Sequence, residues 1–429
     1  MKKKYRIILY TSIFLLCVVA SIILVVKKSN SVYEEESKPK VVKHKSMLSM
    51  NLEQTAGAGD YKTVTQSKWP TEGYKFNAEL SRCENGSTLS WDDTKKAVIV
   101  SGNLSDKCYV YFDIYQPTLA EYIKSQYTGT QGENNIYYHD SDLANGAGDN
   151  SYRYAGANPN NFVCFGTTES PCPTDNLYRI IGVFGENYHG VTGKQLVKLI
   201  KYDYMTTDEL GTDGDYSQTY KEWGMDSTYK GTYGDGERIG VYYWNYKATG
   251  SATNTWSTSL LNKTNLNTNF INNIGTTWAN KIATVTWKVG GNTWANIGTK
   301  TSSVAYTNEI TNPVTTNTTD NATTYSAKIG LMYVSDYGFA ASPDAWTLTM
   351  SSYNNTTATN NNWMYMGLYE WTISRDAGYS DNAFGVSNDG YVSYYYVTNY
   401  FGVRASFNLE SSVSYVSGSG SMSDPIVIN

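Results

Sequence analysis

The stretch that decides the fold is Leu177–Asp203, LYRIIGVFGENYHGVTGKQLVKLIKYD. Leu177–Phe184 and Lys194–Asp203 are rich in large aliphatic and β-branched residues, a composition typical of strands. The segment Gly185–Gly193 between them contains glycine and asparagine, which indicates a turn. We therefore predict two consecutive strands in the middle of the chain.

The segments that follow predict further elements of a mixed α+β domain. Leu266, Phe270 and Ile274 are spaced by four, which predicts an amphipathic helix that ends at Gly275. The Thr- and Asn-rich segment Gly298–Thr324 is interpreted as a long surface loop. Short runs at other positions predict a helical turn and two more strands, at Leu119–Ile123, Ile282–Val289 and Ala327–Val334.

Toward the N-terminus, short strand signals are separated by turn residues and predict a small, all-β, sandwich-like module. The signals lie at Tyr74–Phe76, Thr88–Trp91, Ala97–Val100 and Tyr109–Ile114. Pro117 marks the boundary to the main domain. The predicted organisation is a membrane anchor at 1–28, a flexible spacer at 29–60, the β module at 61–116 and the main domain at 117–429.

Four of the five cysteines form two local pairs. Cys83 and Cys108 bracket a strand-like region, and Cys164 and Cys172 bracket a loop that contains proline. Neither spacing matches a zinc site. Two disulfides formed in an oxidising compartment are the prediction, and two pairs of free thiols are the alternative.

The segment Ile7–Val26 carries no charge and is followed by Lys27 and Lys28. As a helix, it has roughly the 30 Å length needed to cross a bilayer. We predict a single-pass anchor with the body outside the cell, and a cleaved signal peptide stays open as the alternative. Lysines on both sides leave the charge rule for orientation undecided, whereas the Tyr-, Thr- and Asn-rich body favours export.

Charge and histidine content exclude several classes of function. The net charge is −5 and the sequence pI is about 5.4, which argues against binding of nucleic acid. With three histidines in the chain, a histidine-based metal site or general base is not expected. Common hydrolase and nucleotide-binding motifs are absent. We expect no enzymatic activity, no metal and no cofactor.

The order of several motifs resembles a known family. Leu177–Ile181 is followed by a segment with Trp256, Leu266 and Phe270, and then by Ser335–Phe339, Glu370–Ile373 and Gly402–Arg404. Together these motifs resemble bacterial surface proteins with a C-type lectin-like domain, in the branch shared with formylglycine-generating enzymes. The resemblance covers roughly residues 117–429. Arg404 lies between apolar neighbours after Gly402, which predicts a partly buried ion-pair donor of the framework rather than a ligand contact.

Two activities of related proteins are not implied. Formylglycine-generating enzymes use cysteine chemistry in the C-terminal part of the domain, but no cysteine follows Cys172 here. Sugar-binding C-type lectins hold calcium through Glu-Pro-Asn and Trp-Asn-Asp motifs, whereas Trp244-Asn245 is followed by Tyr246 in this chain.

The segment Gly378–Phe401, GYSDNAFGVSNDGYVSYYYVTNYF, has the most unusual composition. It contains six tyrosines but lacks Ile, Leu, Lys, Arg and Glu, so it fits neither a core strand nor an ordinary loop. Tyr, Ser, Gly and Asn dominate antibody binding surfaces. We predict a recognition surface built from Tyr379, Asp381, Asn382, Asn388, Tyr391, Tyr394, Tyr395, Tyr396, Asn399 and Tyr400.

The resemblance adds an expectation about the origin of this composition. Some C-type lectin-like proteins are variable proteins of diversity-generating retroelements, which randomise adenines in Asn-type codons near the C-terminus. Each residue type in Gly378–Phe401 is reachable from such a codon by changing adenines. The resemblance therefore implies that this segment is diversified between fixed flanks.

Three other interpretations stay open. Tyrosine favours strands, so Gly378–Phe401 is alternatively an ordinary structural hairpin.

The function predicted first is a membrane-anchored adhesin- or receptor-like protein that binds a protein or glycan ligand on another surface. The alternative is a structural cell-envelope protein whose domain serves assembly without a ligand, and an enzyme with an unrecognised site is a third possibility.

Overall fold

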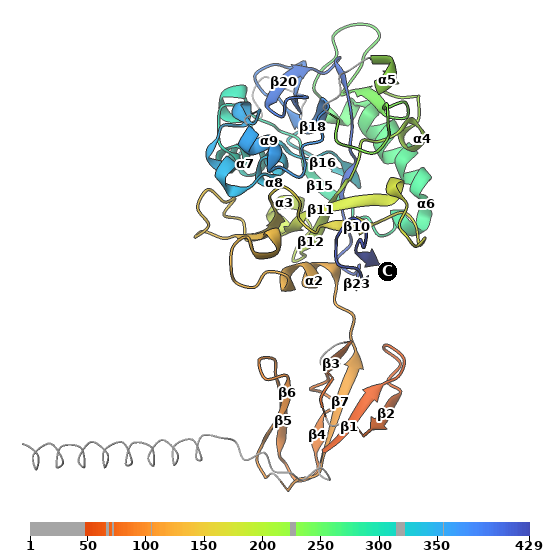
Figure 1. The fold of residues 1–429 in the computed structure, drawn as a ribbon, viewed down its shortest axis with the longest axis vertical. Helices are drawn as coiled ribbons and strands as arrows, with labels where there is room; N and C mark the ends of the chain where they lie inside the picture. Colours follow the sequence, from red (N-terminus) through yellow and green to blue (C-terminus); the bar gives the residue numbers. More distant parts are fainter. Residues whose placement is uncertain are drawn as a thin grey trace, which may run out of the picture. The chain divides into compact units, whose positions relative to one another are not determined.

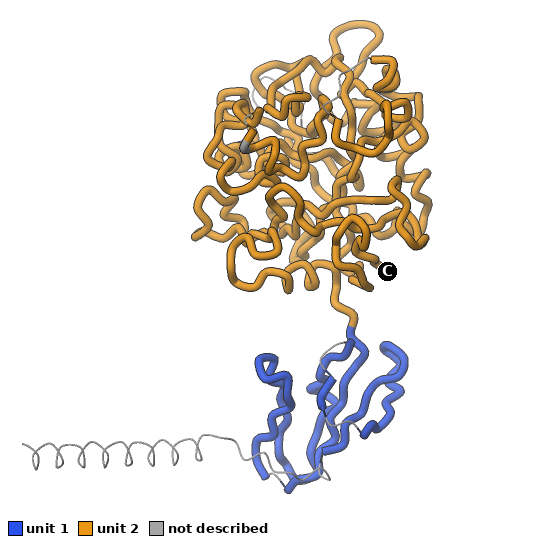
Figure 2. Tube along the Cα trace, viewed as in Figure 1, with its two compact units in different colours: residues 1–115 blue, residues 116–429 orange. Residues whose placement is uncertain are grey.

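The computed structural model describes residues 48–65, 68–70, 73–103, 105–223, 229–314, 322–354 and 356–429. The chain divides into two compact units between Tyr115 and Gln116 (Figure 2), close to the boundary predicted at Pro117. The predicted membrane segment Ile7–Val26 lies outside the described residues. Within those ranges, no helix has the length and apolar character needed to span a membrane.

Unit 1 contains a sheet of order β2-β1-β7-β3, with β4 also paired to β7, and a separate β5–β6 hairpin (Figure 1). Its small core is formed by alternate residues of β1 and β7, namely Met50, Leu52, Val110 and Phe112. The strands are β1 (Leu48–Glu53), β2 (Tyr61–Val64), β3 (Tyr74–Phe76), β4 (Arg82–Cys83), β5 (Thr88–Asp92), β6 (Ala97–Ser101) and β7 (Cys108–Ile114).

The N-terminal limit predicted for this module needs correction. β1 lies inside the range predicted as a flexible spacer, and it pairs in parallel with β7. The last four residues of β1 are buried, because Met50 and Leu52 complete the core and Glu53 is hydrogen-bonded. The ordered module therefore includes residues from Leu48 onward rather than from residue 61.

Both predicted disulfides are present. Cys83 and Cys108 face each other across the β4–β7 pair and are bonded, as are Cys164 and Cys172. This confirms the pairing predicted from sequence. Disulfides persist in oxidising compartments, so they are consistent with an extracellular protein.

The largest sheet of unit 2 has the order β17-β22-β12-β11-β9-β8, with β10 also paired to β11. The strands predicted at Leu177–Phe184 and Lys194–Asp203 are its two central strands, and their residues are buried. Its strands are β8 (Ile136–His139), β9 (Ser151–Tyr154), β10 (Phe162–Cys164), β11 (Leu177–Phe184), β12 (Leu196–Lys201), β17 (Ile329–Gly330) and β22 (Ser406–Asn408).

Within β11, Gly182 follows a register irregularity against β12. A Cβ atom at this position would lie 2.3 Å from the carbonyl oxygen of Tyr152, so a side chain would push β9 away. The close pairing of β11 with β9 therefore requires glycine here.

The described residues of unit 2 also form four smaller sheets, with the orders β13-β14-β21, β15-β16, β18-β19-β20 and β23-β24. Their strands are β13 (Tyr216–Thr219), β14 (Gly240–Tyr243), β15 (Val285–Lys288), β16 (Thr324–Ala327), β18 (Glu370–Arg375), β19 (Asn382–Val386), β20 (Val392–Tyr396), β21 (Tyr400–Phe401), β23 (Tyr415–Ser417) and β24 (Val427–Ile428).

The helices of unit 2 are short and lie around the sheets. The predicted helix near Leu266 is a π-helical segment, Leu261–Phe270, that continues into α6. Gly275 adopts a φ of 75° and interrupts the helix, but helical structure resumes beyond it instead of ending there. The α-helices are α2 (Leu119–Ser125), α3 (Glu186–His189), α4 (Thr207–Leu210), α5 (Tyr220–Trp223), α6 (Ile271–Ala279), α7 (Ser302–Tyr306), α8 (Val334–Ala340) and α9 (Thr356–Asn360).

Two further predictions are wrong in part. The segment predicted as a surface loop, Gly298–Thr324, contains α7 and a π-helical turn whose Glu309 is buried. The predicted strand Ala327–Val334 divides into the end of β16, the short β17 and the start of α8. The molecule is thus α+β, with more sheet than helix.

Candidate functional site

The Tyr-rich segment Gly378–Phe401 forms a hairpin of β19 and β20 and then continues into β21. A tight turn joins the two strands, since Ser387 N–H donates to the Tyr391 carbonyl and Gly390 N–H donates to the Ser387 carbonyl. Gly390 has a φ of 95°, which favours glycine. The hairpin lies at the end of unit 2 opposite α2 (Figure 1).

The structure places the predicted recognition residues at different depths. Tyr379 and Tyr396 are the most exposed, at 54% and 59%. The half-buried members are Asp381, Asn388, Tyr391, Tyr394, Tyr395, Asn399 and Tyr400. Asn382 is buried at 5% exposure because it lies in β19 within the fold, so its inclusion in the recognition surface was wrong.

The buried side chain of Asn254 binds the main chain at the start of the segment. The Asn254 amide nitrogen Nδ2 lies 2.7 Å from the carbonyl oxygen of Asp376, 2.8 Å from that of Tyr379 and 2.7 Å from that of Asn382. Asn254 N–H also donates to the Ser380 carbonyl. These bonds do not depend on the side chains of the residues that they hold.

The rest of the hairpin is held in the same way. Backbone N–H groups of Trp244 and Asn245 donate to the Val397 carbonyl. The Tyr365 hydroxyl donates to the Asn388 carbonyl at 2.5 Å, and the Tyr337 hydroxyl donates to the Gly390 carbonyl at 2.7 Å. Residues outside the segment therefore fix its path through main-chain atoms.

Two half-buried tyrosines of the segment, Tyr395 and Tyr400, join a larger set of rings, which we call the aromatic band. Neighbouring ring centroids in it are 4.6 to 6.1 Å apart, distances at which aromatic rings attract one another. In order of contact, the band consists of Tyr246, Tyr243, Tyr400, Trp223, Tyr369 and Tyr395.

A second, smaller group contains Tyr379. Its ring stacks on that of Tyr394 at 5.6 Å, and Tyr394 meets Trp294 edge-on at 5.5 Å. Tyr394 lies opposite Phe384 in the β19–β20 register. The Tyr379 ring is thus exposed but packs against Tyr394. Its side chain is already restricted before a ligand binds, so binding costs little further conformational entropy.

A buried ion pair joins β18, the strand next to β19, to the segment before β22. Arg404 Nε is 2.7 Å from Glu370 Oε1, and Arg404 Nη2 is 2.8 Å from Oε2. Burial raises the pKa of Glu370, and Arg404 opposes that change. The pair confirms the framework role expected for Arg404, although it is fully rather than partly buried.

Burial shifts the pKa of two ionisable groups in this region. Burial raises the pKa of Asp376 to about 6, yet this carboxylate accepts a hydrogen bond from Gly378 N–H and holds the loop. Burial also raises the pKa of the Tyr395 phenol, so it stays neutral. In the part of the chain that the structure describes, no group of three or more His, Cys, Asp or Glu side chains could hold a metal ion.

Sequence reasoning missed four members of the aromatic band, Trp223, Tyr243, Tyr246 and Tyr369. Two of them belong to the run Val241–Tyr246, VYYWNY, which has a higher density of aromatic residues than the segment Gly378–Phe401. That density was a signal for a binding surface. No local signal marks Trp223, which joins the band through the pairing of β21 with β14.

Comparisons with known proteins assign no family. No protein-family model matches the chain, and neither a curated protein nor a solved structure matches it.

Proposed function

We propose that this protein is a ligand-binding protein of the bacterial cell surface, anchored in the membrane by residues 1–28 and adhesin- or receptor-like in action. Its recognition surface is centred on the exposed side chains of Tyr379 and Tyr396. The ligand is a protein or glycan on another surface, and nucleic acid is not a ligand.

One observation carries this proposal: groups outside the hairpin hold its main chain, while two of its tyrosine side chains remain exposed. The hairpin is held through its main-chain carbonyl groups by Asn254, Trp244, Tyr365 and Tyr337, while Tyr379 and Tyr396 remain more than half exposed. Exposed tyrosine on a rigid frame gives contact area at low entropic cost. A core hairpin would instead bury its large side chains.

We also propose that unit 2 is a C-type lectin-like domain. Motifs that carry the resemblance meet in space: Glu370 pairs with Arg404, and the β18 residue Ile373 donates its N–H to Met332, close to Ser335–Phe339. The main-chain support of the hairpin would let the exposed side chains of Gly378–Phe401, such as Tyr379 and Tyr396, vary without loss of the fold, as retroelement diversification requires. Phe384, Val392 and Val397 belong to the buried core and would have to stay apolar.

Binding by the full-length protein in detergent tests the function. We expect saturable binding to some members of a panel of glycans and intact cells, with little change between moderate and high salt because the surface is aromatic. Failure to bind any member above the level of an unrelated anchored protein would contradict the proposal.

The second candidate is an envelope protein whose domain serves assembly. The half-buried state of Tyr395 and Tyr400 favours it, since these rings already contact other rings within the chain. It predicts self-association or cross-linking to envelope components that survives substitution of Tyr379 and Tyr396.

Sequencing the coding region from sibling strains tests diversification separately. We expect changes at adenine positions of the codons for residues 378–401 and unchanged codons for Asn254, Glu370 and Arg404. Changes spread evenly along the gene would contradict it.

A further inference from the structure

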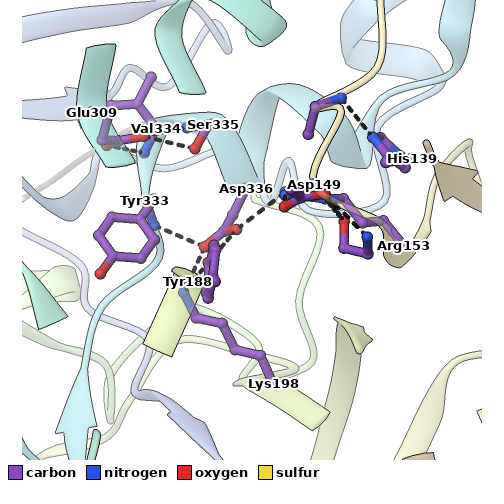
Figure 3. A network of polar contacts seen from close by, with 12 residues as sticks. His139, Asp149, Arg153, Tyr188, Lys198, Glu309, Tyr333, Val334, Ser335 and Asp336 are labelled. Atoms are coloured by element: carbon purple, nitrogen blue, oxygen red, sulfur yellow. Dashed lines mark hydrogen bonds and ion pairs between the residues drawn. The ribbon is translucent and has the colours of Figure 1, made fainter. Parts of the chain in front are cut away.

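A lysine and an aspartate are in contact in the core of unit 2. Lys198 comes from the central strand β12 and Asp336 from the first turn of α8, 138 residues further along the chain. Lys198 Nζ is 2.7 Å from Asp336 Oδ2, and neither side chain is exposed (Figure 3). An amine and a carboxyl group are thus held together where water is excluded.

A hydroxyl group joins the two partners. Tyr188 donates to Asp336 Oδ1 at 2.6 Å, and Lys198 Nζ donates to the Tyr188 hydroxyl at 2.7 Å. The amine, the hydroxyl and the carboxyl therefore form a closed ring of hydrogen bonds. A proton that leaves the amine can reach the carboxyl oxygen through Tyr188, which is the geometry that general acid–base catalysis requires.

Two further groups are directed at the carboxyl oxygens. Tyr333 N–H donates to Oδ2 at 3.0 Å. Arg153 Nη1 lies 3.8 Å from Oδ1, and among the described residues it has no hydrogen-bond partner. The other Arg153 nitrogens bind Asp149 and Ser151. Fixed donors of this kind stabilise negative charge that develops on an oxygen during acyl transfer.

We propose that Lys198 and Asp336 condense into an intramolecular isopeptide bond. The ammonium group first gives one proton to the carboxylate through Tyr188, which leaves a neutral amine and a carboxylic acid. The amine nitrogen then attacks Cγ, so that a bond forms between Nζ and Cγ. Next the bond between Cγ and Oδ1 breaks, and Oδ1 leaves as water with the transferred proton and a second proton from the amine.

The surroundings favour the amide over the ion pair. Two charges buried without water are costly even when paired, and a neutral amide removes both. The rings of Tyr333, Tyr188 and Trp287 lie 4.3, 4.9 and 5.0 Å from Nζ and keep the site apolar. Burial lowers the pKa of Lys198, which makes the neutral amine easier to reach.

A second buried lysine gives an internal comparison. Lys201 Nζ is 2.6 Å from Glu209 Oε1, but Glu209 is partly exposed and caps α4 with its other oxygen. No hydroxyl bridges Lys201 and Glu209 in the contacts of the described residues. We therefore expect Lys201 and Glu209 to remain an ion pair in the same molecule.

The mass of the purified full-length protein tests the bond after reduction and alkylation of all cysteines. We expect an intact mass lower by one water than the sequence requires, and a digest that contains one branched peptide joining Lys198 to Asp336. Peptides with Lys201 and Glu209 should appear unlinked. A full sequence mass, with Lys198 and Asp336 in separate peptides, would overturn the proposal without any variant.

Two variants test which groups react and which group transfers the proton. K198M should restore the full sequence mass. Y188F keeps both reacting groups but removes the bridging hydroxyl, so freshly synthesised Y188F should lose water more slowly than wild type when followed by mass over time. Loss of water by K198M, or by Y188F at the wild-type rate, would contradict the assigned atoms.

Discussion

At the scale of single residues, the buried Arg404–Glu370 pair is the contact whose disruption should cost most. Arg404→Met leaves the Glu370 carboxylate buried without its partner, and breaking such a pair typically costs about 3–5 kcal/mol of the free energy of unfolding. Arg238→Met is the matched control, because Arg238 pairs with Asp175 and Asp208 on the surface, where a pair contributes about 0–1 kcal/mol. Equal losses of unfolding free energy for the two variants in denaturant titrations would contradict the stabilising role of the buried pair.

His139 gives a pH dependence of known sign. Its ring is fully buried, and Nδ1 accepts a hydrogen bond from Ala147 N–H. Burial lowers the pKa of His139 well below 6.5. Below about pH 6.5, His139 therefore binds a proton in the unfolded chain but not in the folded chain. As a result, His139 makes the free energy of unfolding decrease as the pH falls.

The matching experiment compares wild type with His139→Asn, which does not titrate and offers an oxygen in place of Nδ1. From pH 6 down to pH 5, wild type should lose up to about 1.4 kcal/mol per pH unit more than the variant. Parallel stability curves for the two proteins over this window would show that His139 is protonated in the folded state.

At the scale of elements, Asn254 should control the mobility of the loop before β19. Asn254→Ala removes the donor that binds three carbonyl groups of residues 376–382. We expect amide hydrogen exchange in that loop to increase by an order of magnitude or more, since each bond to a buried group contributes about 1 kcal/mol. Asn273→Ala, which removes an exposed bond to the Asp208 carbonyl, should not change it.

Sequence patterns predicted some elements well and others poorly, for physical reasons. The strand at Leu177–Phe184 was predictable because a fully buried strand is a continuous apolar run. The helix α7 was missed because its sequence, SSVAY, is short and lies in a Thr- and Asn-rich region. It packs against α8, and the π-helical turn that continues it holds the Glu309 carboxylate, which accepts hydrogen bonds from Val334 N–H and Ser335 N–H.

The candidate site was predictable in the same partial way. Composition identified Gly378–Phe401, but it could not separate exposed Tyr379 from buried Asn382, because both lie close together in a segment of uniform polarity. Nor could it identify Trp223 or Tyr369, which reach the aromatic band through long-range strand pairing. Contacts between distant segments do not follow from local periodicity.

At the scale of the whole molecule, the two units should differ in their dependence on disulfides. Unit 1 has a core of four buried apolar side chains, and Cys83–Cys108 closes a 25-residue separation within it. Cys83→Ser with Cys108→Ser should cost about 3 kcal/mol, a large share of the stability of so small a module. Limited proteolysis should then cut between residues 48 and 115 while unit 2 stays intact.

The Cys164→Ser with Cys172→Ser protein is the control, because that bond spans eight residues beside a large core. Its proteolysis pattern should resemble that of wild type in unit 1. Resistance of unit 1 to protease without Cys83–Cys108 would show that the core alone holds the module together.

The central claim is that exposed tyrosines of the hairpin bind a ligand on another surface. Adhesion of cells that display equal amounts of full-length wild type, Y379A/Y396A or M422A/V427A tests it most directly, with a panel of glycan-coated beads and intact cells as targets. Met422 and Val427 are exposed apolar residues outside the hairpin, at 43% and 42%. We predict that the tyrosine variant loses at least ten-fold in adhesion, about 1.4 kcal/mol, and that the control variant matches wild type. Equal adhesion by all three proteins, or none by wild type, would contradict the claim.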